Sequence, residues 1–76
     1  MLNDKIILQI KNDAAGIAEG WISIPDGVPE EKALQIAWQH LLDTGICWQL
    51  QGWFGRQAIR LLEEGFIHNK QEGKND

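Results

Sequence analysis

A tryptophan-rich stretch from residue 38 to residue 65, interrupted by glycines, constrains the fold more than any other part of this sequence. It holds three of the chain's four tryptophans, and its glycines stand at positions 45, 52, 55 and 65. Glycine enters the left-handed backbone region without a steric cost, so such positions commonly end helices. The stretch therefore predicts two short helices joined by a connector.

The boundaries of both helices can be predicted. Pro29 suits the first position of a helix and Gly45 its end, while the second helix runs from about Trp53 to Glu64 and is closed by Gly65. Apolar residues recur at helical spacing in both; they are Ala33, Leu34, Ala37, Trp38, Leu41 and Leu42 in the first, and Phe54, Ala58, Leu61 and Leu62 in the second. Residues 46–51 fit either one helical turn or an extended connector.

Residues 5–24 fit two descriptions. Apolar residues alternate over 5–11, and 17–24 is a second run that suits a strand, with a turn between them. A helical interpretation is also open, because Ile7, Ile10, Ala14, Ile17 and Trp21 follow one another at intervals of three or four residues. Glycines at 16 and 20 would each cost that helix about 1 kcal/mol relative to alanine.

We therefore predict an α+β fold, in which an N-terminal β-hairpin packs on the two C-terminal helices. Trp21, Trp38, Trp48 and Phe54 are expected in or near the core. A chain of 76 residues predicts a single domain, placed at 1–68, in which residues 66–67 pack back as a short edge strand. Residues 69–76 contain no apolar side chain and are expected to form a disordered tail.

Bulk composition narrows the class of protein. A net charge of −4 argues against broad affinity for nucleic acid phosphates. One cysteine excludes an intramolecular disulfide. No apolar run approaches the ~18 residues of a membrane span, and the first residues lack the layout of a signal peptide. The sequence thus predicts a cytoplasmic protein without membrane contact.

Reactive groups are few. His40, Cys47 and His68 do not stand at metal-ligand spacing, so no metal or other cofactor is expected. The only conceivable nucleophile and base are Cys47 and His40, and Cys47 lies between Ile46 and Trp48 like a core thiol. We predict that the protein is not an enzyme.

The second helix predicts a binding surface instead. Trp and Arg are the residue types most enriched at interface hot spots, and both occur on the side of this helix opposite Phe54 and Ala58. Two glutamines in the connector alternate with apolar residues. The predicted partner-binding residues are Gln49, Gln51, Trp53, Arg56, Gln57 and Arg60. An alternative buries Trp53 in the core and pairs Arg56 with Asp43 inside the fold.

Nucleic acid binding is the alternative function. Two short helices joined near a glycine resemble a helix-turn-helix, and Arg56, Gln57 and Arg60 are side chains that read base edges. Glu63 and Glu64 offset those two arginines, whereas a DNA reader usually carries a basic patch.

Residues 41–67 contain the pattern Thr-Gly-x-x-Trp-Gln-Leu-Gln-Gly-x-x-Gly-Arg, followed by a helix that ends in glycine. This pattern resembles a family of small bacteriophage proteins. The matching residues are Leu42, Thr44, Gly45, Trp48, Gln49, Leu50, Gln51, Gly52, Phe54, Gly55, Arg56, Ala58, Leu61, Leu62, Gly65 and Ile67. The resemblance implies a phage or prophage origin and expression in the cytoplasm of a bacterial host. Small phage proteins of this kind often bind one host protein, including host defence complexes. Together with the short chain, its scarce reactive groups and its exposed Trp and Arg, this leads us to predict a module that inhibits or modulates a host protein. A homodimer through the same surface is also open.

Overall fold

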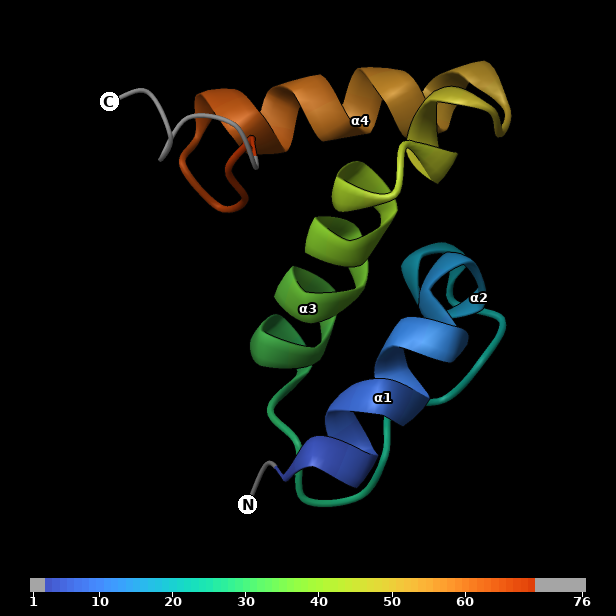
Figure 1. Cartoon of the computed structure of the whole chain (residues 1–76), viewed down its shortest axis with the longest axis vertical. Coiled ribbons are helices and arrows are strands. Elements are labelled where there is room, and N and C mark those ends of the chain that lie inside the picture. The colour runs from blue at the N-terminus through green and yellow to red at the C-terminus, as the bar shows by residue number, and fades with distance from the viewer. Residues whose placement is uncertain (1–2, 70–76) are drawn as a thin grey trace.

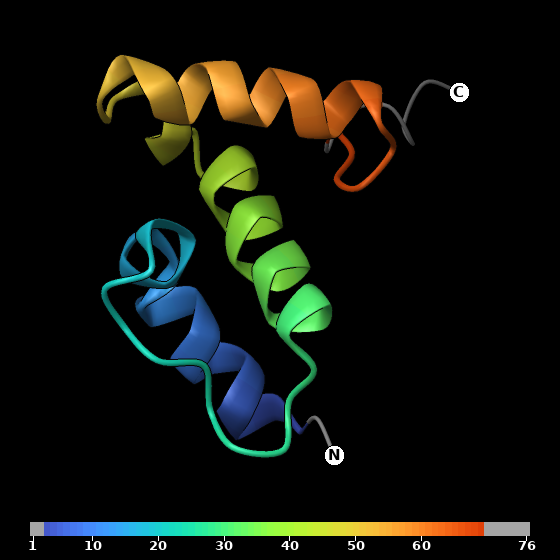
Figure 2. The same ribbon diagram turned by 180° about the vertical axis from the view of Figure 1, so that it is seen from behind.

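The computed structural model describes residues 3–69, and within that range all regular structure is helical. The elements are α1 (Asp4–Asn12), α2 (Ala14–Glu19), α3 (Glu30–Asp43), the 3-10 turn η1 (Ile46–Trp48) and α4 (Gly52–Glu63). Figures 1 and 2 show α1 and α2 along one side of α3, while α4 lies crosswise at the C-terminal end of α3. Most of the predicted polar tail lies outside the described residues.

The predicted β-hairpin is wrong, because α1 and α2 occupy its residues. Ile10, Ala14 and Ile17, which stand at helical spacing, are all buried, and burial of such a face outweighs the poor helix propensity of glycine. Asn3 starts α1 by accepting a hydrogen bond from the Ile6 amide through its side chain at 2.9 Å. Helical packing against α3 therefore decides the structure of this region.

Gly16 and Gly20 have separate roles in α2. Gly20 ends the helix in the left-handed region, at φ 85°. Gly16 lies under Ile22, and a Cβ atom at residue 16 would stand 2.6 Å from Ile22 Cγ1. The chain therefore turns sharply after α2, and Trp21 points outward. The expectation that Trp21 belongs to the core is wrong, since 81 % of its surface is exposed.

The two C-terminal helices are confirmed, with starts and ends close to those predicted. Gly45 and Gly65 follow them with φ of 79° and 78°, as expected for residues that end helices. The connector is one 3-10 turn and not an extended segment. Residues 66–67 form no edge strand, because the described part of the chain has no sheet for them to join.

The core is built around α3. Its inner face, which includes Ala33, Ala37 and Leu41, is buried against α1 and α2. Trp38 and Phe54 are buried as predicted, and Trp53 completes an aromatic cluster between α3 and α4. The Trp38 and Trp53 ring centroids are 6.1 Å apart, edge to face, a favourable aromatic geometry.

The segment after α4 packs back on α3. Gln35 Nε2 donates to the carbonyl oxygen of Phe66 at 2.9 Å. The Gln39 amide binds the main chain of His68 twice, donating to its carbonyl oxygen at 2.7 Å and accepting from its N–H at 3.0 Å. Between these residues, Ile67 is fully buried.

None of the helices among residues 3–69 is long and apolar enough to cross a membrane.

Candidate functional site

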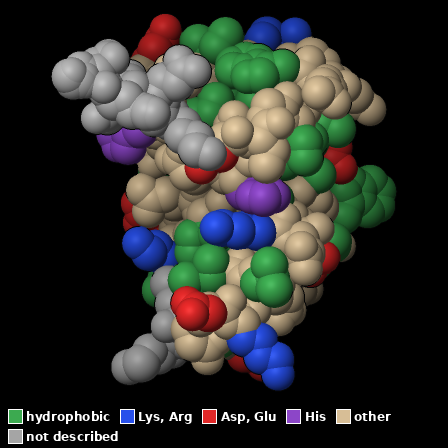
Figure 3. Space-filling view, in the orientation of Figure 1, with side chains coloured by type: hydrophobic (Ala, Val, Ile, Leu, Met, Phe, Trp, Pro, Cys, Tyr) green, Lys and Arg blue, Asp and Glu red, His purple; other side chains and the backbone are tan. Residues whose placement is uncertain are grey.

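The outward side of α4 is the candidate site. Successive residues of an α-helix are turned by about 100°, which places Arg56, Ile59 and Arg60 on one side of α4. Arg56 and Arg60 are exposed, and Ile59 is 48 % exposed. We call these three residues, together with Trp48, the α4 face. In Figure 3, apolar and basic side chains stand next to one another at the edge formed by α4.

Trp48 joins this face through Gly55. A Cβ atom at residue 55 would lie 3.4 Å from Trp48 Cε3, so the indole ring rests against α4 at a position without a side chain. Half of the Trp48 surface, 51 %, is still exposed. Ile59 lies one helical turn beyond Gly55 on the same side. The indole ring, the Ile59 side chain and the two arginines therefore share one surface.

Trp48 and Trp53 have exchanged the places that the sequence predicted. Trp48 was expected in the core and is exposed, whereas Trp53 was expected on the surface and is half-buried between Trp38 and Phe54, with its ring centroid 4.4 Å from that of Phe54. The alternative that placed Trp53 in the core is thus closer to the structure. The spacing of Trp48 and Gly55 was the signal that could have shown the contact.

The other predicted partner-binding residues lie on or near the α4 face. Gln49 and Gln51 are exposed just before α4, while Gln57 is half-buried toward the aromatic cluster. Ile59 was missed by the sequence interpretation, because it lies outside the apolar stripe of α4. Asp43, proposed as an internal partner of Arg56, has its carboxylate Oδ1 hydrogen-bonded by Gln39 Nε2 at 2.9 Å.

The electrostatic character of the α4 face differs from that of the whole chain. Arg56 and Arg60 are two of the seven Lys and Arg residues in a chain with net charge −4. Glu63 lies one turn beyond Ile59, at the C-terminal end of the same side. The face therefore carries two basic side chains and an acidic one at its C-terminal end, with the apolar side chains of Ile59 and Trp48 beside them.

Groups that could support catalysis or metal binding lie apart from this face. Cys47 is buried, and burial raises the pKa of its thiol above the ordinary value, which disfavours the nucleophilic thiolate. Within residues 3–69, no three His, Cys, Asp or Glu side chains gather as metal ligands would.

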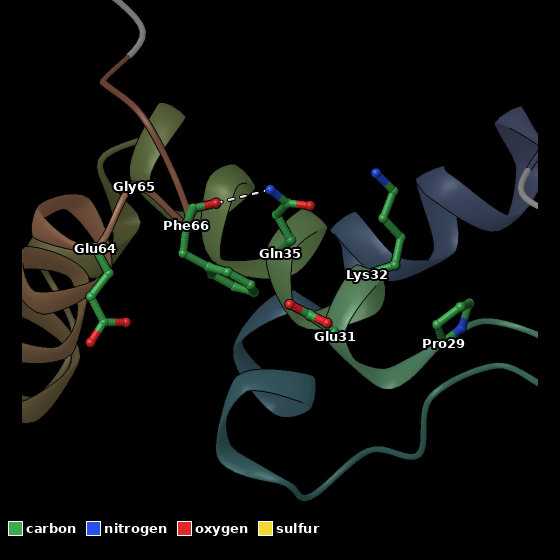
Figure 4. A pocket seen from close by; sticks show the side chains of 7 residues that line it. All are labelled: Pro29, Glu31, Lys32, Gln35, Glu64, Gly65 and Phe66. Carbon is green, nitrogen blue, oxygen red and sulfur yellow. Dashed lines mark hydrogen bonds between the residues drawn. The ribbon is translucent and has the colours of Figure 1, made fainter.

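A hollow of about 410 Å³ lies between the start of α3 and residues 64–66. Figure 4 shows the Gln35 amide hydrogen-bonded to the Phe66 carbonyl there, with Glu31, Lys32 and Glu64 around it. Its lining contains no serine, cysteine or histidine. It therefore lacks the usual nucleophile and base of a hydrolytic site.

The fold and the α4 face define a small helical domain with one mixed apolar and basic surface. The model of a family described as a domain of unknown function (DUF7417) matches residues 16–74. This match spans well over half of the chain, so the protein belongs to that family. No curated protein and no solved structure matches the chain.

Proposed function

We propose that this protein is a small protein-binding module whose α4 face engages a host protein and inhibits or modulates it. The observation that carries the proposal is the half-exposed indole ring of Trp48, held against Gly55 near Ile59, with Arg56 and Arg60 exposed on the neighbouring surface of the same helix. Exposing large apolar groups to water is unfavourable, and a partner would remove this surface from solvent. The sequence resemblance to phage proteins supports a bacterial host protein as the partner.

The chemistry of the face describes the partner. The indole ring and the isoleucine side chain are complementary to an apolar depression on the partner. Arg56 and Arg60 are complementary to carboxylates around that depression. Interfaces of standard size bury about 800 Å² per partner and depend on a few aromatic and arginine anchors. A host protein with an acidic rim around an apolar pocket fits this description.

The test is affinity capture from a bacterial lysate with matched variants. Trp48→Ala and Arg56→Ala each remove one side chain of the α4 face. Trp21→Ala is the control, because Trp21 is also an exposed tryptophan but lies outside the α4 face. Circular dichroism verifies that each variant is folded. We expect one host protein to be captured by the wild type and by Trp21→Ala, and lost with Trp48→Ala. Equal capture by all variants would show that the α4 face is not the binding site.

Nucleic acid binding is the second candidate. Helix α4 lies crosswise on α3 (Figure 1), and both of its arginines are exposed. It predicts a salt-dependent gel shift with duplex DNA that weakens in Arg56→Ala and Arg60→Ala. A protein partner is favoured, because Trp48 and Ile59 are exposed beside these arginines, and a phosphate backbone has no apolar surface for them to contact.

A further inference from the structure

A second surface, separate from the α4 face, runs along α3. A hollow of about 330 Å³ lies between α1 and α3, and another of about 240 Å³ lies where α1 meets α2. Lys11 and His40 line both hollows, so the two hollows adjoin. We call the hollow between α1 and α3 the α3 groove and define it by Ile7, Lys11, Lys32, Ile36 and His40.

Two lysines give the α3 groove a positive charge. Lys11 comes from α1 and Lys32 from α3, and together they bring two of the chain's seven Lys and Arg residues to one hollow. Asp43 is the one acidic residue in the lining of either hollow, and its carboxylate accepts a hydrogen bond from Gln39. Figure 3 shows a basic side chain beside a histidine at the centre of this face, and another basic side chain toward its left edge. The groove is thus a basic strip on an acidic protein.

The edge of this groove already binds peptide main chain. Gln35 and Gln39, one helical turn apart on α3, hold residues 66–68 through main-chain hydrogen bonds, and Ile67 is buried between them. The same two glutamines also line the hollow between α1 and α3. The half-buried aliphatic side chains of Ile7 and Ile36 lie beside the lysines there. The groove therefore offers cationic groups and apolar surface to a short segment of chain, beside an edge where the two glutamine amides already hold residues 66–68.

We propose that the α3 groove binds a short acidic peptide segment of another protein. Carboxylates of that segment pair with Lys11 and Lys32, and an aliphatic side chain covers Ile7 and Ile36. Charge complementarity selects this occupant, because a net charge of −4 repels acidic segments from most of the molecule and the groove attracts them. The proposal is independent of the function assigned to the α4 face.

The probe is an N-acetylated, C-amidated pentapeptide of alternating glutamate and leucine, titrated into the whole protein and followed by amide chemical shifts. We expect saturable shifts in α1 and α3 and none along α4. Lys11→Gln and Lys32→Gln should each weaken binding about two- to fivefold, as for exposed ion pairs. Lys5→Gln is the matched control, since it removes the same charge from α1 outside the groove and should change affinity less than twofold. Added salt should weaken binding.

Three results would overturn the proposal. The first is equal loss of affinity in Lys5→Gln, which would indicate a general charge effect. The second is equal binding of a pentapeptide with glutamine in place of glutamate. The third is the same set of shifts with inorganic phosphate alone, which would make the groove a plain anion site. Circular dichroism of each variant shows whether it is folded, and surface lysine substitutions usually change stability by less than about 0.5 kcal/mol.

Discussion

The contact between Gly16 and Ile22 makes a quantitative prediction about stability. Alanine at position 16 would stabilise α2 by about 1 kcal/mol through its helix propensity. Its Cβ atom would also collide with the Ile22 side chain, at 2.6 Å from Cγ1 and closer still to Cδ1. The observed change in unfolding free energy is therefore the difference between two opposed terms.

The steric term follows from the burial of Ile22. A fully buried isoleucine contributes about 1.5–3 kcal/mol, and Ile22 is 40 % exposed, so displacing it forfeits about 1–2 kcal/mol. Gly16→Ala in the wild type should then be neutral or destabilising by up to about 1 kcal/mol. In an Ile22→Ala background the collision is gone, and the same change should stabilise by about 1 kcal/mol.

Urea unfolding followed by far-UV circular dichroism measures all four proteins of this cycle. We expect a coupling free energy of about 1–2 kcal/mol between positions 16 and 22. Gly55→Ala is the control, because a Cβ atom there meets Trp48 at ordinary contact distance; it should stabilise by about 0.5–1 kcal/mol in either background. Additive effects at 16 and 22, within about 0.5 kcal/mol, would refute the packing assigned to Ile22.

Three further predictions concern other parts of the fold. Burial raises the pKa of the Cys47 thiol, so on raising the pH the unfolded chain loses the thiol proton before the folded chain does. The contribution of this thiol to the free energy of unfolding should be constant below about pH 8.5 and fall above it. Urea unfolding of Cys47→Ala should lack this fall at high pH. Acrylamide should quench Trp21 and Trp48 but not Trp38 in the folded protein, so the Trp21→Phe/Trp48→Phe variant should lose most quenchable fluorescence; unchanged quenching would contradict the exposures described. Gln39→Ala removes both hydrogen bonds to His68 and should lower the free energy of unfolding by about 1–2 kcal/mol. The amide protons of residues 67–69 should then exchange faster than in the control Gln9→Ala, which replaces an exposed glutamine on α1.

The sequence predicted α3 and α4 well, because their apolar stripes extend over three turns and glycine stands where each helix ends. The N-terminal region failed for a physical reason. A short run such as Ile6 to Ile10 satisfies both a period of two and intervals of three and four, so periodicity alone does not separate strand from helix. Packing of Ile10 and Ile17 against α3 decides the outcome, and that surface exists only in the folded chain.

The site was predicted in part. Arg56 and Arg60 lie off the apolar stripe of α4, so their exposure follows from helical geometry alone. Which tryptophan enters the core depends on the direction of the chain after Gly45, and this direction is set by η1. Because a 3-10 turn and an extended connector would point Trp48 to different sides, local sequence did not determine its place.

Helix α4 is attached to the rest of the molecule at both of its ends. At its start, Trp48 of η1 lies against Gly55, and after its end Gln35 and Gln39 hold residues 66–68 on α3. Opening α4 away from α3 would break the hydrogen bonds of residues 66–68 with Gln35 and Gln39. Its slowest amide protons should therefore exchange only when the whole domain unfolds. For the partner that we propose, the α4 face would be an ordered surface, so binding would require little loss of conformational entropy from this protein.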